Sequence, residues 1–272
     1  MATAFTTLDY SVADGIATIT LNRPKSLNAI TSAMYAELPV ALRMAAEDKT
    51  TAITVLTANG RFFSSGADVT ERPADLPPPL SDVHGTRAYY RRRWDGTIAR
   101  ASVEIINHPK VLVAALNGPV VGVAAALISH ADIIYASESA TLHAPFTALA
   151  ISPEAGSSFS FVQRMGYAKG MEALLFSKKM SPQELLTSGF VNEIFPTDGF
   201  HDHVRNYLVG ALQAAAPASL RTTKALIHSA FKEQETKAVY DELNQLTERF
   251  VSGDPQNVFA SLAAKHGAKS KL

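Results

Sequence analysis

Short apolar segments of strand length alternate with longer amphipathic segments as far as Pro196, and this alternation restricts the chain to few folds. Residues 15–21 alternate apolar and polar side chains, which is typical of a half-buried strand. A helix is expected over about 31–47, and apolar residues at spacings of three and four predict a longer one over 86–106. Alternation of this kind predicts an α/β core of about 200 residues. Further short strands are expected at 52–57, 111–116, 132–136, 140–143 and 190–195.

The chain beyond Pro196 has an almost wholly helical pattern as far as Lys265. These helices are amphipathic, so each has an apolar face that must pack on the core or on a neighbouring subunit. We therefore expect a core over residues 1–199 and a helical region over 200–272 that serves packing and oligomerisation.

The charge balance and the absence of cysteine exclude several classes of function. Lys plus Arg and Asp plus Glu each number 25, so no overall field favours nucleic acid or an anionic membrane. A chain without cysteine has no disulfides and no thiolate chemistry. The first residues lack a signal-peptide pattern, and the longest apolar stretch, 118–128, is shorter than the roughly 20 residues of a membrane helix. We expect an intracellular protein with no membrane span.

Three segments carry residue types suited to binding a ligand at the backbone. Their sequences are LNRPKSLNA at 21–29, GRFFSSGAD at 60–68 and NGPVVGVAAA at 117–126. The small residues of 64–67 let a ligand approach the main chain closely. Gly122 and Val123 lie where a loop turns into a helix, which leaves amides unpaired at the positive end of the helix dipole. For either of the last two segments alone, turn and packing glycines are an equally good interpretation.

These three segments, in this order, resemble the enoyl-coenzyme A hydratase/isomerase family, also called the crotonase superfamily, from about Leu8 to Pro196. The resemblance implies an α/β spiral of repeated strand-strand-helix turns, an acyl-CoA substrate, and a homotrimer or dimer of trimers. Coenzyme A is part of the substrate, so no separate cofactor and no metal is implied. The amides of Ala67 and Val123 would hold the thioester oxygen as an oxyanion. The implied substrate-binding residues are Lys25, Ser26, Leu27, Ser65, Gly66, Ala67, Asp68, Val69, Gly122 and Val123.

The acidic residues distinguish the reactions of this family. Hydratases of the family hold a water between two glutamates, whose positions here are Ala126 and Phe146, so hydration is not expected. Glu154 matches the single glutamate of the peroxisomal isomerases that convert 3-enoyl-CoA to 2-enoyl-CoA. One carboxyl group suffices to move a proton from C2 to C4, and apolar neighbours should raise its pKa. The alternative is structural, because Ser152-Pro153-Glu154 also has the pattern of a capped helix start.

The last three residues, Ser270, Lys271 and Leu272, spell the tripeptide that a peroxisomal import receptor recognises at a free carboxyl terminus. A solvated basic tail is the simpler alternative. We therefore expect a peroxisomal enoyl-CoA isomerase with Glu154 as its acid/base. A dienoyl-CoA isomerase, an enoyl-CoA hydratase and a non-catalytic acyl-CoA-binding protein of the same fold remain as alternatives.

Overall fold

The structure is a computed structural model, which describes residues 5–71 and 75–269, without the side chains of 263–269. Its strands are β1 (Leu8–Ala13), β2 (Ile16–Leu21), β3 (Ile53–Ala58), β4 (Val111–Leu116), β5 (Val120–Val121), β6 (Ile133–Ser137), β7 (Leu142–His143) and β8 (Glu193–Phe195). Its α-helices are α1 (Ser32–Glu47), α2 (Val83–Trp94), α3 (Arg100–Ile106), α4 (Val123–Ile128), α5 (Ser157–Leu175), α6 (Pro182–Thr187), α7 (Phe200–Gln213), α8 (Pro217–His228), α9 (Lys232–Ser252) and α10 (Asp254–Lys269). Shorter helical turns are η1 (Pro24–Ser26), η2 (Asp95–Ala99) and η3 (Thr147–Leu149).

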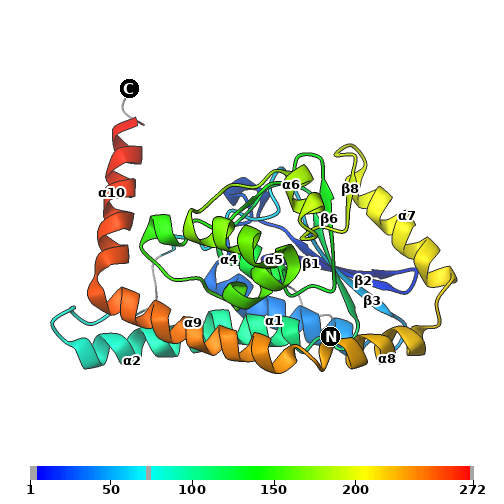
Figure 1. Ribbon diagram of the computed structural model, residues 1–272, viewed down its shortest axis with the longest axis horizontal. Helices are drawn as coiled ribbons and strands as arrows, with labels where there is room; N and C mark the ends of the chain where they lie inside the picture. The colour runs from blue at the N-terminus through cyan, green and yellow to red at the C-terminus, as the bar shows by residue number, and fades with distance from the viewer. Residues whose placement is uncertain (1–4, 72–74, 270–272) are drawn as a thin grey trace.

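A six-stranded sheet with the order β1-β2-β3-β4-β6-β8 forms the centre of the molecule (Figure 1). Only the β1–β2 pair is antiparallel, and each later strand joins the sheet in parallel register. The short strands β5 and β7 form a second, parallel pair outside this sheet. The alternation of strands and helices thus gives the α/β spiral that the resemblance implies.

Helices cover both faces of the central sheet. The larger apolar core lies on the face covered by α1, α3, α4 and α5, and includes Ile19, Leu42, Leu116 and Phe161. The smaller core on the opposite face is formed by the sheet and α7, which contributes Phe200, Val204 and Leu208. Because both faces are buried, β3 and β4 are apolar almost throughout, as is usual in parallel sheets.

The helical region after β8 packs on the core of the same chain. Helix α9 runs beneath the core and contacts α2, α3 and α5, while α10 extends away from the body (Figure 1). Val239, Leu243 and Leu246 of α9 are fully buried in the larger core. Intrachain packing therefore accounts for the apolar face of α9. The division at residue 199 and a role in oligomerisation stay predictions.

Two local features differ from the expectations. Strand β1 is largely exposed apart from Leu8, so its sequence lacks the alternation that reveals a half-buried strand. The expected helix 86–106 begins earlier, at Val83, and is interrupted by the wide turn η2, although its apolar face is buried as expected. No helix within the described ranges is long and apolar enough to span a membrane.

Candidate active site

A cavity of about 670 Å³ lies between the loops after β3 and β4, the turn before α5, and helices α1, α2 and α9. Its lining is mostly apolar and aromatic. Pro77, Tyr89, Tyr90 and Trp94 form one wall of the cavity. Leu246 and Phe250 of α9 and Phe259 of α10 close it from the C-terminal region. A cavity of this size and character suits a ligand with an apolar chain.

Two small-residue segments are held side by side at the cavity. Ser64 and Val120 form a parallel bridge, and the amide of Val121 donates to the carbonyl of Ser64 at 3.0 Å. Gly66 has φ +91°, and a Cβ there would lie 3.0 Å from the carbonyl oxygen of Val121. Gly122 also has a positive φ, of 57°. The close approach therefore requires glycine at position 66.

Of the amides of residues 64–68 and 120–123, this packing leaves two without an acceptor. The amide of Gly66 donates to the Ser64 hydroxyl, that of Asp68 to the carbonyl of Ile30, and that of Gly122 to the carbonyl of His143. Within the described ranges, the amides of Ala67 and Val123 have no such partner, and both residues line the cavity. Two unpaired donors in one cavity can bind a developing oxyanion.

Glu154 lines the same cavity, and a tight turn positions it there. The amide of Ser157 donates to the carbonyl of Glu154 at 3.2 Å, and both intervening residues are left-handed, with φ +57° at Ala155 and +82° at Gly156. A left-handed alanine is strained, which is common at functional sites. Helix α5 consequently begins only at Ser157, with Gly156 as its N-cap. The alternative in which Ser152 caps a helix containing Glu154 is therefore wrong.

The surroundings of Glu154 favour its neutral form. Its side chain is buried, and Phe146, Leu149 and Ile151 line the cavity beside it. Burial first, and then the negative charge of Glu242, raise the pKa of Glu154 to about 8. The carboxyl group is thus a strong base once deprotonated and an effective acid when protonated.

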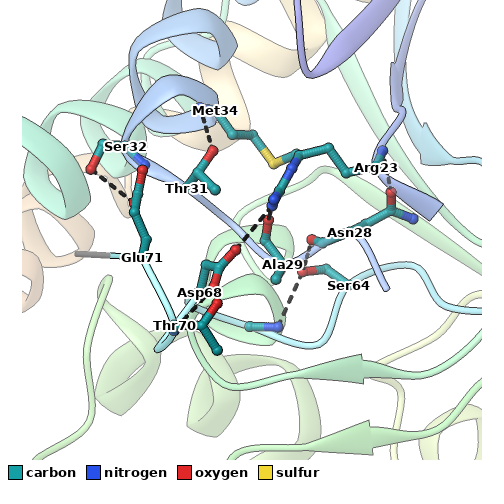
Figure 2. Close-up of polar contacts among 11 residues, drawn as sticks. Arg23, Asn28, Ala29, Thr31, Ser32, Met34, Ser64, Asp68, Thr70 and Glu71 are labelled. Carbon is teal, nitrogen blue, oxygen red and sulfur yellow. Dashed lines mark hydrogen bonds and ion pairs between the residues drawn. The ribbon is translucent and has the colours of Figure 1, made fainter. Parts of the chain in front are cut away.

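The other two described acids of the cavity are occupied by local hydrogen bonds (Figure 2). Asp68 accepts from the backbone and hydroxyl of Thr70 and pairs with Arg23 at 3.2 Å. The bonds from Thr70 chiefly hold the pKa of Asp68 below its usual value. Glu71 accepts from the amide and hydroxyl of Ser32. Among the cavity's described acids, Glu154 alone has no hydrogen-bond donor on its carboxyl group.

The predicted binding residues fall into two groups. Ser26, Ser65, Gly66, Ala67, Asp68, Val69, Gly122 and Val123 line the cavity. Lys25 is exposed and Leu27 is half-buried, and neither contributes to the lining. Leu27 instead accepts the amide of Ser65 through its carbonyl. A contact of Lys25 and Leu27 with substrate stays a prediction.

Several residues at the site are not among those that the sequence predicts. Tyr35 of α1 is buried at the cavity, and the charge of Glu154 adds to burial in raising its pKa. Arg93 has the sequence pattern of a solvated face but is half-buried and lines the cavity. Glu242 lies one turn from the buried residues of α9, so helical periodicity indicates its burial but not its contact with the turn after Glu154.

Most of the chain is similar to one known protein family. The model of the enoyl-CoA hydratase/isomerase family matches residues 11–261. The chain belongs to this family. A crystallised member, an enoyl-CoA hydratase/isomerase from Pseudoalteromonas atlantica T6c, superposes with a TM-score of 0.81 at 26% identity, over 96% of this chain and 98% of that one. The fold is therefore that of the crotonase superfamily.

Three relatives have names that specify a reaction. Human enoyl-CoA delta isomerase 2 is 37% identical over all of this chain and 66% of its own length. Mouse peroxisomal enoyl-CoA delta isomerase 3 is 37% identical over 81% of this chain and 67% of its own. A Δ(3,5)-Δ(2,4)-dienoyl-CoA isomerase from Pyricularia oryzae is 36% identical over 95% and 96%. The chain thus spans slightly less than two thirds of the human protein.

Proposed function

We propose that this protein isomerises 3-enoyl-CoA to 2-trans-enoyl-CoA in the oxidation of unsaturated fatty acids. The observation that carries the proposal is a single carboxyl group without a hydrogen-bond donor, Glu154, in the same cavity as the unpaired amides of Ala67 and Val123. The human and mouse relatives named as enoyl-CoA delta isomerases support it.

The reaction needs one proton to move between two carbons. The Glu154 carboxylate takes a proton from C2 of the 3-enoyl thioester, and the electron pair shifts into a dienolate whose negative charge rests on the thioester oxygen. The amides of Ala67 and Val123 donate to that oxygen, and each such donor typically contributes about 10²–10³ in rate. Protonated Glu154 then returns the proton to C4, which places the double bond between C2 and C3 and restores the carboxylate.

Two features disfavour the alternatives. Ala126 and Phe146 are fully buried and apolar, so the two hydratase positions hold no group to activate a water.

The relative from P. oryzae supports a dienoyl-CoA isomerase as the second candidate. That reaction generally uses an additional acid, and Asp68 and Glu71 are occupied by Thr70 and Ser32. A dienoyl substrate therefore requires one of these acids to be released when it binds.

The test is to incubate the purified protein with 3-hexenoyl-CoA and follow conjugation of the double bond with the thioester. The wild type should convert it, and Glu154→Gln should lose nearly all turnover. Full activity in the variant removes Glu154 from its role, and absence of wild-type turnover favours a binding protein. Formation of 3-hydroxyacyl-CoA from 2-enoyl-CoA instead supports a hydratase, and turnover of a 3,5-dienoyl-CoA alone supports the second candidate.

Location, cofactor use and assembly complete the proposal. The mouse relative is named as peroxisomal, which supports a peroxisomal location and import by the receptor for the tripeptide. Ser270, Lys271 and Leu272 lie outside the described residues. We propose that the reaction needs no cofactor besides the CoA of its substrate, since the two amides stabilise the enolate. A homotrimer or dimer of trimers is the proposed assembly.

A further inference from the structure

The loop that carries Glu154 is held by residues from outside it. Arg249 of α9 donates from Nε to the carbonyl of Ala150 at 2.9 Å, at the beginning of the loop. His130 Nε2 lies 2.7 Å from the carbonyl of Ala155. At the end of the loop, Glu242 of α9 accepts the amides of Gly156 and Ser158, both at 2.6 Å. Helix α9 thus contacts both ends of the loop.

Glu242 is an unusual partner for these amides. Its two oxygens each accept one amide, Oε2 from Gly156 and Oε1 from Ser158, whereas an amide side chain would offer a single oxygen in this place. The side chain is only 6% exposed, although an ionised carboxylate loses much solvation in such a place. Amides at the start of a helix have no acceptor within the helix itself. The Glu242 carboxylate, which belongs to α9, therefore also caps the beginning of α5.

We propose that Glu242 is a positioning residue for the isomerisation: by holding the amides of Gly156 and Ser158, it keeps the turn that aims the Glu154 carboxyl group into the cavity. This inference rests on the proposed function for its effect on rate, although the contact itself does not depend on it. Glu242 does not line the cavity, so it acts on a substrate there only through Glu154 and its turn.

Besides positioning the turn, Glu242 affects the acidity of Glu154, because its negative charge helps to raise the pKa of Glu154. Burial raises the pKa of Glu242 itself, against the opposing effect of its hydrogen bonds and of His130. His130 also lies 3.5 Å from Glu235, which in turn pairs with His228 of α8. On the cavity side, the negative charge of Glu154 helps to raise the pKa of Tyr35 in α1. The positive charge of Arg93 in α2 opposes this rise.

Two substitutions separate position from charge. Glu242→Gln keeps the size of the side chain but removes the charge and one of the two acceptors. Glu242→Asp keeps the charge but is one methylene shorter, so both amide bonds cannot persist without movement of the turn. Asp241→Asn is the matched control, because the neighbouring Asp241 is exposed to solvent and, within the described part of the chain, pairs with Lys237 alone.

Two readouts are needed for each folded variant. The first is kcat and KM with 3-hexenoyl-CoA across pH. The second is the titration of the Glu154 carboxyl carbon by NMR of protein labelled with ¹³C-glutamate, assigned by its loss in Glu154→Gln. The second readout needs no turnover, so it tests the contact even if the proposed reaction is wrong.

Both Glu242 variants should lower kcat by about 10- to 100-fold with KM changed little, because a small displacement of a reacting group is costly while the cavity walls are intact. Glu242→Gln should also move the Glu154 titration and the acid limb of the rate profile to lower pH. Glu242→Asp should leave the pKa of Glu154 raised. If Glu242→Gln does not fold, the kinetics of Glu242→Asp test the inference. Kinetics and titration like those of Asp241→Asn in both folded variants would overturn the inference.

Discussion

Gly66 lies directly against the carbonyl of Val121, and this contact joins the two segments that supply the unpaired amides. A Cβ on Gly66 would lie 3.0 Å from the Val121 oxygen, which is tighter than nine in ten real Cβ contacts. The φ of +91° at Gly66 independently disfavours any other residue. The position of the Ala67 amide therefore depends on a residue without a side chain next to it.

Gly66→Ala should consequently lose activity through displacement of the Ala67 amide. We expect kcat to fall by about 10²–10³, the effect of losing one oxyanion donor. The matched control is Gly210→Ala in α7, where a Cβ meets no atom within 4 Å and alanine is the better helix former. Steady-state kinetics of the two variants check this, and equal activity would show that the Ala67 amide is not used.

The rate should depend on pH through the deprotonated form of Glu154. Because the pKa of this group is about 8, only about a tenth of the free protein carries the base at pH 7. We expect log(kcat/KM) to rise with unit slope between pH 6 and pH 7 and to level off above pH 8. A profile that is already flat at pH 6 would place the base elsewhere or give it an ordinary pKa.

The same shift predicts how stability depends on pH. The folded protein binds the Glu154 proton more tightly than the unfolded chain, whose pKa is the ordinary 4.5. The free energy of unfolding therefore falls as pH rises from 4.5 to about 8, at roughly 1.4 kcal/mol for each pH unit within that window. Glu154→Gln removes this loss.

Urea unfolding of both proteins at pH 5 and pH 8.5 tests the sign. The variant should be close to the wild type at pH 5 and more stable by a few kcal/mol at pH 8.5. A difference that stays constant with pH would mean that Glu154 titrates normally.

Much of the fold is predictable from the sequence because burial leaves a pattern in each element. Strands β3 and β4 are buried almost throughout and mostly apolar, and α2 and α3 keep spacings of three and four across η2. Strand β1 was not predicted because only Leu8 on it is buried. Its pairing depends on backbone hydrogen bonds to β2, which every residue type except proline can both donate and accept.

The candidate site is predictable where it depends on small residues in sequence, as at 64–67 and 122–123. The turn after Glu154 was not, because the left-handed φ of Ala155 is imposed by its surroundings. The contact between Glu242 and Gly156 joins positions far apart in the chain. No local pattern encodes such a contact, since it arises only when α9 packs against α5.

The aromatic wall of the cavity should set which acyl chains are accepted. The ring of Phe250 on α9 packs against Tyr90 at 4.8 Å and Trp94 at 5.2 Å between centroids, so helices α2 and α9 meet through these three side chains. All three line the cavity. Phe250→Ala should enlarge this end and raise kcat/KM for long or branched 3-enoyl-CoA relative to 3-hexenoyl-CoA, with some loss of stability from the removed ring.

The ratio of kcat/KM between a long and a short substrate is the quantity to measure, because it cancels any general loss of active protein. Phe176→Ala is the control, since Phe176 is 79% exposed at the end of α5 and lies outside the cavity lining. A ratio that changes in Phe250→Ala and stays constant in Phe176→Ala would assign the acyl chain to the α2–α9 wall. An unchanged ratio in both would place the chain along another side of the cavity.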